Sequence, residues 1–273
     1  IWFRWLGRLA APLFFYALAV GFQHTRNRKK YLLRLYLANV GMVFFNQIMC
    51  MLQRKLDYVA YQPKNHNIFT TLFCAGVLIC IWENRKEKKK FFTYIGIYIF
   101  WQAMVMGLAI LAEAFDYVWR GNALLQTVLR TNYIFPLLGG IWDAEGGVFF
   151  IVLGVWLYCA VEKKGKLALH YILFCGAYMF MCQGDILYRI MSRFSFWGYH
   201  KLADVIYFGS SFVGIPLGTS DLSLLTEFYQ WMMIGALPIM LSCNGKRGKS
   251  LKWLFYAAYP LQFLVLYGIS YYK

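Results

Sequence analysis

Long apolar segments separated by short charged stretches dominate the chain. Eight segments are apolar over most of their length and end close to a charged residue. They cover residues 9–22, 31–51, 68–82, 91–111, 146–161, 167–181, 222–243 and 251–268. A membrane-spanning helix needs about 20 mainly apolar residues, because the hydrocarbon core of a bilayer is about 30 Å thick. The pattern therefore predicts an all-α fold, a polytopic transmembrane helical bundle with about eight spans.

Two further apolar segments, 133–141 and 205–217, are too short or too interrupted by glycine and proline to be predicted as spans. Non-helical backbone at membrane depth needs protein or water around it, because lipid offers no hydrogen-bonding groups. We interpret both segments as re-entrant or interfacial pieces, with a cavity wall and a helix in the headgroup layer as open alternatives. Little of the chain is left for a soluble domain, and residues 1–273 are predicted to form a single integral-membrane domain.

The composition supports the same class of protein. Of the 273 residues, 60% are hydrophobic, 20% are aromatic and only 15% are charged. Soluble domains have about half apolar and about a quarter charged residues, and disordered chains have fewer apolar ones. Nearly all of the seven cysteines lie within or at the ends of apolar segments, and none forms a Cys-x-x-Cys pair. Such thiols behave as small hydrophobic groups, so neither a disulfide framework nor a metal site is predicted.

The charged residues are unevenly distributed. Lysine and arginine number 28 against 12 aspartates and glutamates, and sixteen of the cations fall in the stretches 26–30, 85–90, 163–166 and 246–252. These four stretches fall at alternate ends of the predicted spans, and lysine and arginine mark cytoplasmic loops. We therefore expect a multi-pass protein of the bacterial inner membrane with all four stretches in the cytoplasm. Because the cations are divided among short loops beside the lipid bilayer, we expect no nucleic-acid partner.

The most specific motif lies at the start of the chain. It runs from Gly7-Arg8-Leu9-Ala10-Ala11-Pro12 through Gly21-Phe22, His24-Thr25 and a basic turn to Tyr31-Leu32-Leu33-Arg34-Leu35. Asn67-Ile68-Phe69-Thr70, Asn244-Gly245-Lys246-Arg247-Gly248 and Tyr259-Pro260-Leu261 follow later. Together these motifs resemble the TraX family of integral-membrane acetyltransferases, which is related to a wider group of membrane acyltransferases.

The resemblance implies an acyltransferase that uses acetyl-CoA as its acyl donor. The best-known activity of the family is acetylation of the N-terminal amine of conjugative pilin, and an envelope glycan hydroxyl stays open as an alternative acceptor. Family members usually begin with a span that bears an Asp-His pair; this sequence lacks that span, so we expect one further span upstream of Ile1. Their C-terminal motif usually reads Tyr-Pro-x-His, whereas this chain has Gln262 at the last position.

Several cations of the motif are candidates for binding the donor. Coenzyme A carries a pyrophosphate and a 3′-phosphate; arginine binds phosphate bidentately, and lysine acts as a point charge. The candidate donor-binding residues are Arg8, Arg26, Arg28, Lys29, Lys30 and Arg34. The positive-inside rule alone would also explain the loop cations, and snorkelling to the interface would explain Arg8 and Arg34.

Transfer to an amine needs a base that takes the proton of the attacking group. His24 is a candidate because it borders the basic turn, and Asp185 and Glu113 are candidates on the opposite side of the predicted membrane. Asp143 and Glu145 flank the entry to a span and join that group. Each of these residues has an alternative interpretation as a helix-end group or a solvated loop charge.

A polar stripe runs along the second predicted span, where Asn39, Asn46 and Gln53 recur every seven residues and share one helix face. Such a stripe lines a substrate path or, more often, forms hydrogen bonds between helices.

Two further functions stay open for the whole chain: a non-enzymatic membrane component of a secretion or conjugation machine, and a transporter. Internal repeats of the kind found in transporters are not visible in the sequence.

Overall fold

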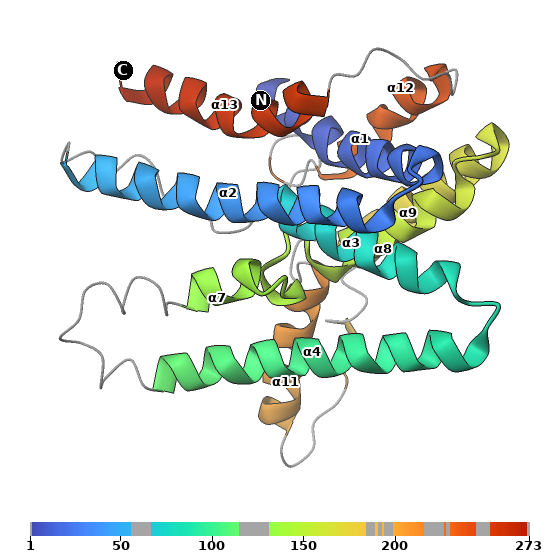
Figure 1. Cartoon of the computed structure of the whole chain (residues 1–273), viewed down its shortest axis with the longest axis horizontal. Coiled ribbons are helices and arrows are strands. Elements are labelled where there is room, and N and C mark those ends of the chain that lie inside the picture. The colour runs from blue at the N-terminus through green and yellow to red at the C-terminus, as the bar shows by residue number, and fades with distance from the viewer. Residues whose placement is uncertain are drawn as a thin grey trace. The chain divides into compact units, whose positions relative to one another are not determined.

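The computed structural model describes residues 2–55, 67–114, 131–183, 189–190, 193, 199–215, 227, 230–243 and 252–271. Within these residues the regular elements are helices, and no β-strand is present. In chain order they are α1 (Trp2–His24), α2 (Arg28–Lys55), α3 (Ile68–Glu83), α4 (Lys88–Ala114), α7 (Thr131–Leu137), η1 (Ile141–Asp143), α8 (Gly147–Ala160), α9 (Lys164–Gln183), α11 (Tyr199–Val213), η2 (Gln230–Gly235), α12 (Ala236–Ser242) and α13 (Lys252–Tyr271), where η marks a 3₁₀ helix (Figure 1). The all-α fold predicted from the sequence is confirmed.

The helices group into two compact units, and each unit is assembled from segments far apart in the sequence. Unit 1 contains Ile1–Arg28, Cys74–Phe91 and Gly146–Gly245. Unit 2 contains Lys29–Phe73, Phe92–Glu145 and Lys246–Lys273. Each unit has buried apolar side chains and a cluster of polar side chains that contact one another.

Three of the described helices are long and apolar enough to cross a membrane, over Arg28–Met49 in α2, Lys88–Ala112 in α4 and Lys164–Cys182 in α9. Helices α3 and α8 are apolar but have only 16 and 14 residues, fewer than the about 20 that a span needs. The described part of the 222–243 segment is not one helix, since it begins as η2 and continues as α12. The described residues thus show three candidate spans, and the predicted number of about eight is not shown.

Residues 205–213 of the segment predicted as an interrupted piece at 205–217 belong to a continuous helix, α11, which begins earlier, at Tyr199, and residues 216–217 lie outside the described part of the chain. The apolar pattern misses that start because its first residues include histidine, lysine and aspartate. The helix stops at Gly214, which has a φ of +89°, a conformation that glycine adopts without strain. A Cβ atom on Gly214 would lie 2.1 Å from the carbonyl oxygen of Gly146. The end of α11 therefore meets the start of α8 backbone to backbone within unit 1.

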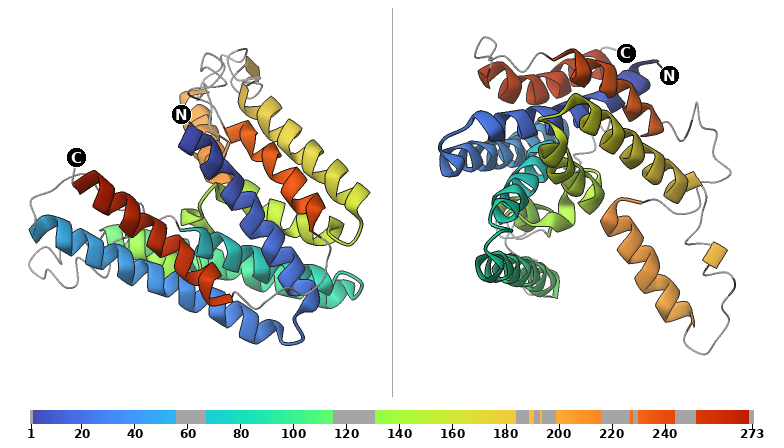
Figure 2. Two further views of the ribbon diagram at one scale, coloured as in Figure 1. Left: turned by 90° about the horizontal axis from the view of Figure 1, so that it is seen from above. Right: turned by 90° about the vertical axis from the view of Figure 1, so that its right-hand side faces the viewer.

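Unit 1 is built around α1, which packs against α8, η2 and α12, while α9 packs against α8 and η2. Figure 2 shows α1 in dark blue among these helices. Phe15 and Phe22 of α1 are fully buried, and the Phe15 ring centroid lies 6.0 Å from that of Phe150 in α8. A Cβ atom on Gly154 would lie 2.8 Å from the Cβ of Ala75. The glycine therefore permits a close approach of two helices, as small residues do in membrane bundles.

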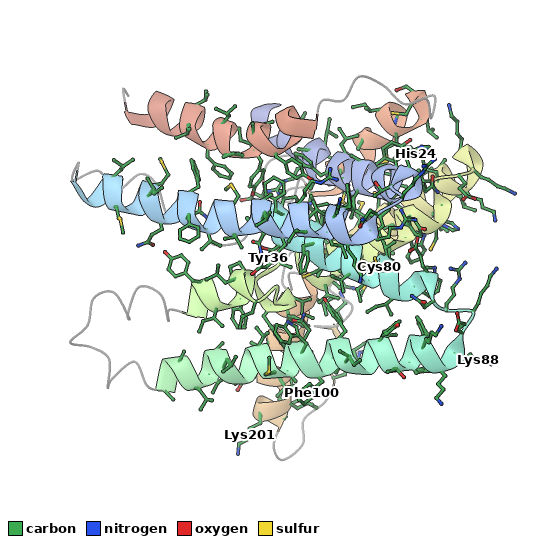
Figure 3. All side chains as sticks on the ribbon, in the orientation of Figure 1. His24, Tyr36, Cys80, Lys88, Phe100 and Lys201 are labelled. Atoms are coloured by element: carbon green, nitrogen blue, oxygen red, sulfur yellow. The ribbon has the colours of Figure 1, made fainter. Side chains whose placement is uncertain are left out.

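Unit 2 holds a short helix, α7, whose last carbonyl groups are paired by side chains of two longer helices. The final carbonyls of a helix have no partner within the helix itself. Here the carbonyl oxygens of four consecutive residues, 136–139, each accept a side-chain hydrogen bond. The donors are Tyr36 and Asn39 of α2 and Trp101 and Gln102 of α4, and Figure 3 labels Tyr36. Helix α7 is thereby fixed between α2 and α4 (Figure 1).

Gln102 also forms hydrogen bonds with residues of η1. The Gln102 Oε1 atom accepts a hydrogen bond from the Ile141 N–H at 2.9 Å, and the Gln102 carbonyl accepts one from Trp142 Nε1 at 3.3 Å. Ile134 and Pro136 are buried. The segment predicted at 133–141 as a re-entrant or interfacial piece is therefore enclosed by protein, which is the condition that such backbone requires.

Replacing Asn39 by leucine is expected to destabilise unit 2. Asn39 bonds the Pro136 carbonyl, Asn67 and Thr70, and each buried polar group left without a partner costs about 1–3 kcal/mol. We expect the free energy of unfolding, measured in detergent micelles, to fall by about 2–4 kcal/mol. Leu37→Ala, at an exposed position on the same helix, is the control and should change it by less than about 0.5 kcal/mol. Equal stability of both variants would show that these hydrogen bonds do not hold α7.

Candidate functional site

Arg28, the first residue of α2, closes a cluster of interactions in unit 1. Its guanidinium donates to Glu83 Oε1 at 2.8 Å and to the Thr25 carbonyl at 2.6 Å. The same group lies over the Phe22 ring, 5.4 Å from its centroid. Tyr158 donates to the same Glu83 oxygen at 2.6 Å. The cluster ties the turn after α1 to the C-terminal ends of α3 and α8.

This cluster brings parts of three basic stretches, residues 26–28, 85–90 and 163–166, to one end of unit 1, which we call the basic end. The Arg28–Glu83 pair joins the first two stretches, and Tyr158 joins the third. Lys164 Nζ in the third of these stretches donates to the Leu241 carbonyl in α12 at 2.7 Å. Residues 246–251 of the fourth basic stretch lie outside the described part of the chain. Three of the basic stretches thus meet at one end of unit 1, and the cytoplasmic location of all four stays a prediction.

The candidate donor-binding cations differ in their surroundings. Arg26, Lys29, Lys30 and Arg34 have exposed side chains. Arg28 is engaged with Glu83, and its side chain is only 29% exposed. A phosphate group in the solvent can reach these exposed side chains, and it could bind Arg28 only if Arg28 left or shared its carboxylate partner.

Arg8 lies in the N-terminal half of α1 and is partly exposed. Its charge acts on the Tyr178 hydroxyl of α9, and that hydroxyl donates to the Gly214 carbonyl at 3.3 Å. Arg8 is therefore placed near the junction of α8, α9 and α11 in unit 1, away from the Arg28 cluster along α1.

The predicted bases are only partly visible in the structure. His24 ends α1 and has an exposed side chain (Figure 3). Glu113 lies in the last turn of α4 and Asp143 ends η1, but the side chains of both lie outside the described residues. Asp185 lies outside them altogether. Among the side chains that are described, no three histidine, cysteine, aspartate or glutamate residues gather as metal ligands would.

The start of α3 forms a buried polar site in unit 2. Asn67 precedes the helix, and its Oδ1 accepts a hydrogen bond from the Thr70 N–H at 3.0 Å, as an N-cap side chain does. Asn39 Oδ1 accepts hydrogen bonds from Asn67 Nδ2 at 3.0 Å and from Thr70 Oγ1 at 2.7 Å. All three side chains are at most 1% exposed. The Asn67-Ile68-Phe69-Thr70 motif therefore encodes a helix cap that is also bonded to α2.

These bonds show which of the two roles predicted for the polar stripe on α2 applies to Asn39. Asn39 forms hydrogen bonds between helices, as most such residues do. Asn46 is also buried, and the side chain of Gln53 lies outside the described residues.

Tyr259 of α13, which belongs to the C-terminal motif, contacts this polar site at the start of α3. Its hydroxyl donates to Glu145 Oε2 at 3.0 Å and accepts from the Ile68 N–H at 3.4 Å. Its ring packs edge-on against Phe69, with centroids 5.5 Å apart. Thr71 Oγ1 donates to the Glu145 carbonyl at 3.2 Å. Two motifs separated by 191 residues in the sequence therefore meet beside one carboxylate.

Sequence reasoning misses the roles of Glu83 and Tyr158 and the pairing of Glu145 with Tyr259. Glu83 had a visible signal, because it is an acidic residue between an apolar segment and a basic stretch, where oppositely charged partners are near in the sequence. The Glu145–Tyr259 pair had none, because the two residues are 114 positions apart.

A family model described as TraX protein matches residues 1–137, half of the chain. The matched range runs from α1 through α7 and includes Arg28, Asn39 and the Asn67 cap. Glu145 and Tyr259 lie beyond it. No curated protein and no solved structure matches the chain.

The Arg28–Glu83 pair should show a measurable coupling energy. Because the two side chains are 29% and 30% exposed, we expect Arg28→Ala and Glu83→Ala to be non-additive by about 0.5–1.5 kcal/mol in a double-mutant cycle of unfolding. The more exposed Lys90–Glu87 pair is the control, with an expected coupling below about 0.5 kcal/mol. Additive effects at Arg28 and Glu83 would show that the pair does not stabilise the basic end.

Cysteines introduced in place of Arg26, Lys88 and Lys164 in a cysteine-free background should react alike, because these residues lie at one end of unit 1. We expect all three to be protected from a membrane-impermeant maleimide in intact cells and to react after permeabilisation. Labelling of one position in intact cells, with the others protected, would contradict the shared side.

Proposed function

We propose, because this chain belongs to the TraX family, that it is a membrane-embedded acyltransferase. It transfers an acetyl group from cytosolic acetyl-CoA to an amine at the N-terminus of a peptide or pilin, with an envelope hydroxyl as the alternative acceptor. The observation that carries the proposal is the family match itself, which covers the turn after α1 and the capped start of α3. The apolar helices support a multi-pass location in the bacterial inner membrane.

The turn after α1 and the start of α2 supply the charge that the donor requires. Arginine and lysine both bind phosphate groups, and Arg26, Lys29, Lys30 and Arg34, whose side chains are exposed, are the proposed phosphate ligands. Arg28 contributes differently, since its bonds to Glu83 and the Thr25 carbonyl fix the turn on which Arg26 lies. Arg8 stays a candidate for contact with the acyl part of the donor.

An apolar bundle suits acyl transfer because exclusion of water protects a thioester from hydrolysis. The reaction then needs a base inside the protein or at its rim. His24, Asp185 and Glu113 stay predictions for that role. The exposed side chain of His24 at the end of α1 would place the base in water, which is the least favourable of these settings for a thioester.

The proposal is tested with the purified protein in lipid nanodiscs. We expect acetyl-CoA to bind, and free coenzyme A thiol to appear only when a peptide with an unblocked N-terminal amine is also present. The same peptide with a blocked N-terminus is the matched control. Binding of neither donor nor acceptor would overturn the acyltransferase proposal and favour a non-enzymatic component of a secretion or conjugation machine.

Substitutions in the turn test how the donor is held. Arg26→Ala and Arg34→Ala should each weaken acetyl-CoA binding by about 1.5–3 kcal/mol, the range for hydrogen bonds to charged groups. Lys89→Ala, in the basic stretch after α3, is the control and should change the dissociation constant by less than about twofold. Equal small effects at all three positions, measured by isothermal titration, would show that these cations only orient the protein in the membrane.

A further inference from the structure

We propose that Glu145 is the catalytic base for the acceptor amine and that Tyr259 is the residue that positions it. The inference rests on the proposed acyltransferase function and names the group that this function leaves unassigned. Its basis is the meeting of the start of α3, the turn before α8 and the C-terminal motif around one carboxylate within unit 2.

The side chain of Glu145 is more exposed than the polar side chains around it. Asn39, Asn67, Thr70 and Thr71 are essentially inaccessible, and the first three are hydrogen-bonded to one another. Glu145 is only partly buried. An incoming amine can therefore reach Glu145, whereas it cannot reach the buried asparagines without displacing the helix cap.

Tyr259 fixes the carboxylate through a directed chain of hydrogen bonds. The Ile68 N–H donates to the Tyr259 hydroxyl, and that hydroxyl donates to Glu145 Oε2. Phe69 and Phe263 hold the Tyr259 ring in edge-on contacts with centroid distances of 5.5 and 5.1 Å. Hydrogen bonds in such a chain polarise one another. The positive N-terminal end of α3 also favours a negative charge at Glu145.

The Glu145 side chain has the chemistry that an amine acceptor needs. A carboxylate attracts the protonated ammonium form by its charge. The ammonium group releases one proton to water, and the neutral amine that results is the nucleophile. Its lone pair attacks the acetyl carbonyl carbon, a C–N bond forms, and the C–S bond breaks with its electron pair going to sulfur. Glu145 takes the second proton from the nitrogen and passes it to the coenzyme A thiolate. The products are the N-acetylated amine, coenzyme A thiol and the one proton released to water, so atoms and charge balance.

A carboxylate base at Glu145 also favours one class of acceptor over another. A cationic amine gains a charge-assisted hydrogen bond to Glu145, whereas a neutral hydroxyl gains only an ordinary one. We therefore infer that amines are preferred over envelope hydroxyls as acceptors.

Glu145→Gln tests the base directly, because glutamine keeps the shape and removes the basic oxygen. With the full chain in nanodiscs, we expect kcat to fall by about 100-fold or more, as loss of a general base does, while acetyl-CoA affinity stays within about twofold. Glu145→Asp should retain more activity than Glu145→Gln. Glu87→Gln, the same change at an exposed glutamate, is the matched control and should leave kcat unchanged. Unaltered acetyl-CoA binding and gel-filtration behaviour show that each variant is folded.

Tyr259→Phe tests the positioning role through the pH profile. Loss of a hydrogen bond to the ionised carboxylate disfavours its charged form, so the acidic limb of kcat/KM should move to higher pH. In Glu145→Gln the fall of kcat/KM at acidic pH should disappear. Tyr94→Phe, an exposed tyrosine on α4, is the control and should leave the limb in place.

The outcomes separate the two proposals. A wild-type protein that neither binds acetyl-CoA nor transfers its acetyl group overturns the acyltransferase function and this inference with it. A wild-type protein that acetylates an amine, together with a Glu145→Gln variant within about threefold of its kcat, overturns the role of Glu145 and leaves the function intact.

Discussion

Backbone polar groups inside an apolar bundle need hydrogen-bond partners, and this constraint organises unit 2. The four carbonyls at the end of α7 are paired by side chains of α2 and α4, and the first N–H groups of α3 are paired by Asn67 and Tyr259. Asn39 takes part in both sets, because it bonds the Pro136 carbonyl and the α3 cap. The hydrogen bonds that pair these backbone groups thus belong to the same network as the hydrogen bond from Tyr259 to Glu145.

Much of the helical framework is readable from the sequence because apolar length and flanking charge report directly on helices in lipid. The positions of α2, α3, α4, α8, α9 and α13 follow from that pattern. The pattern fails where the backbone is interrupted, as at η2 and α12, since composition does not encode where one apolar segment divides into two elements. The number of spans is likewise not fixed by hydropathy, because α3 and α8 are as apolar as a span but shorter.

The candidate site is less predictable for a different physical reason. The cations of each basic stretch are neighbours in the sequence, so the positive charge of the stretch is predictable. The carboxylate that pairs with Arg28 comes from another helix and is not. Residue spacing along one helix predicted that Asn39 and Asn46 share a helix face, and only the fold supplies the partners of Asn39 on α7 and beside α3. Tyr259 stands in a motif singled out from the sequence, yet the motif says nothing of Glu145. Contacts across more than a hundred residues leave no periodic signal in one chain.

The central proposal is that this protein transfers an acetyl group from acetyl-CoA to an amine, with Glu145, which Tyr259 holds by a hydrogen bond, as the base. Mass spectrometry of a defined acceptor peptide tests this claim most directly, after incubation with the nanodisc-embedded protein and acetyl-CoA. The account predicts a mass gain of one acetyl group, located by fragmentation at the N-terminal amine. An acceptor of unchanged mass, from a protein that has bound acetyl-CoA, would contradict it.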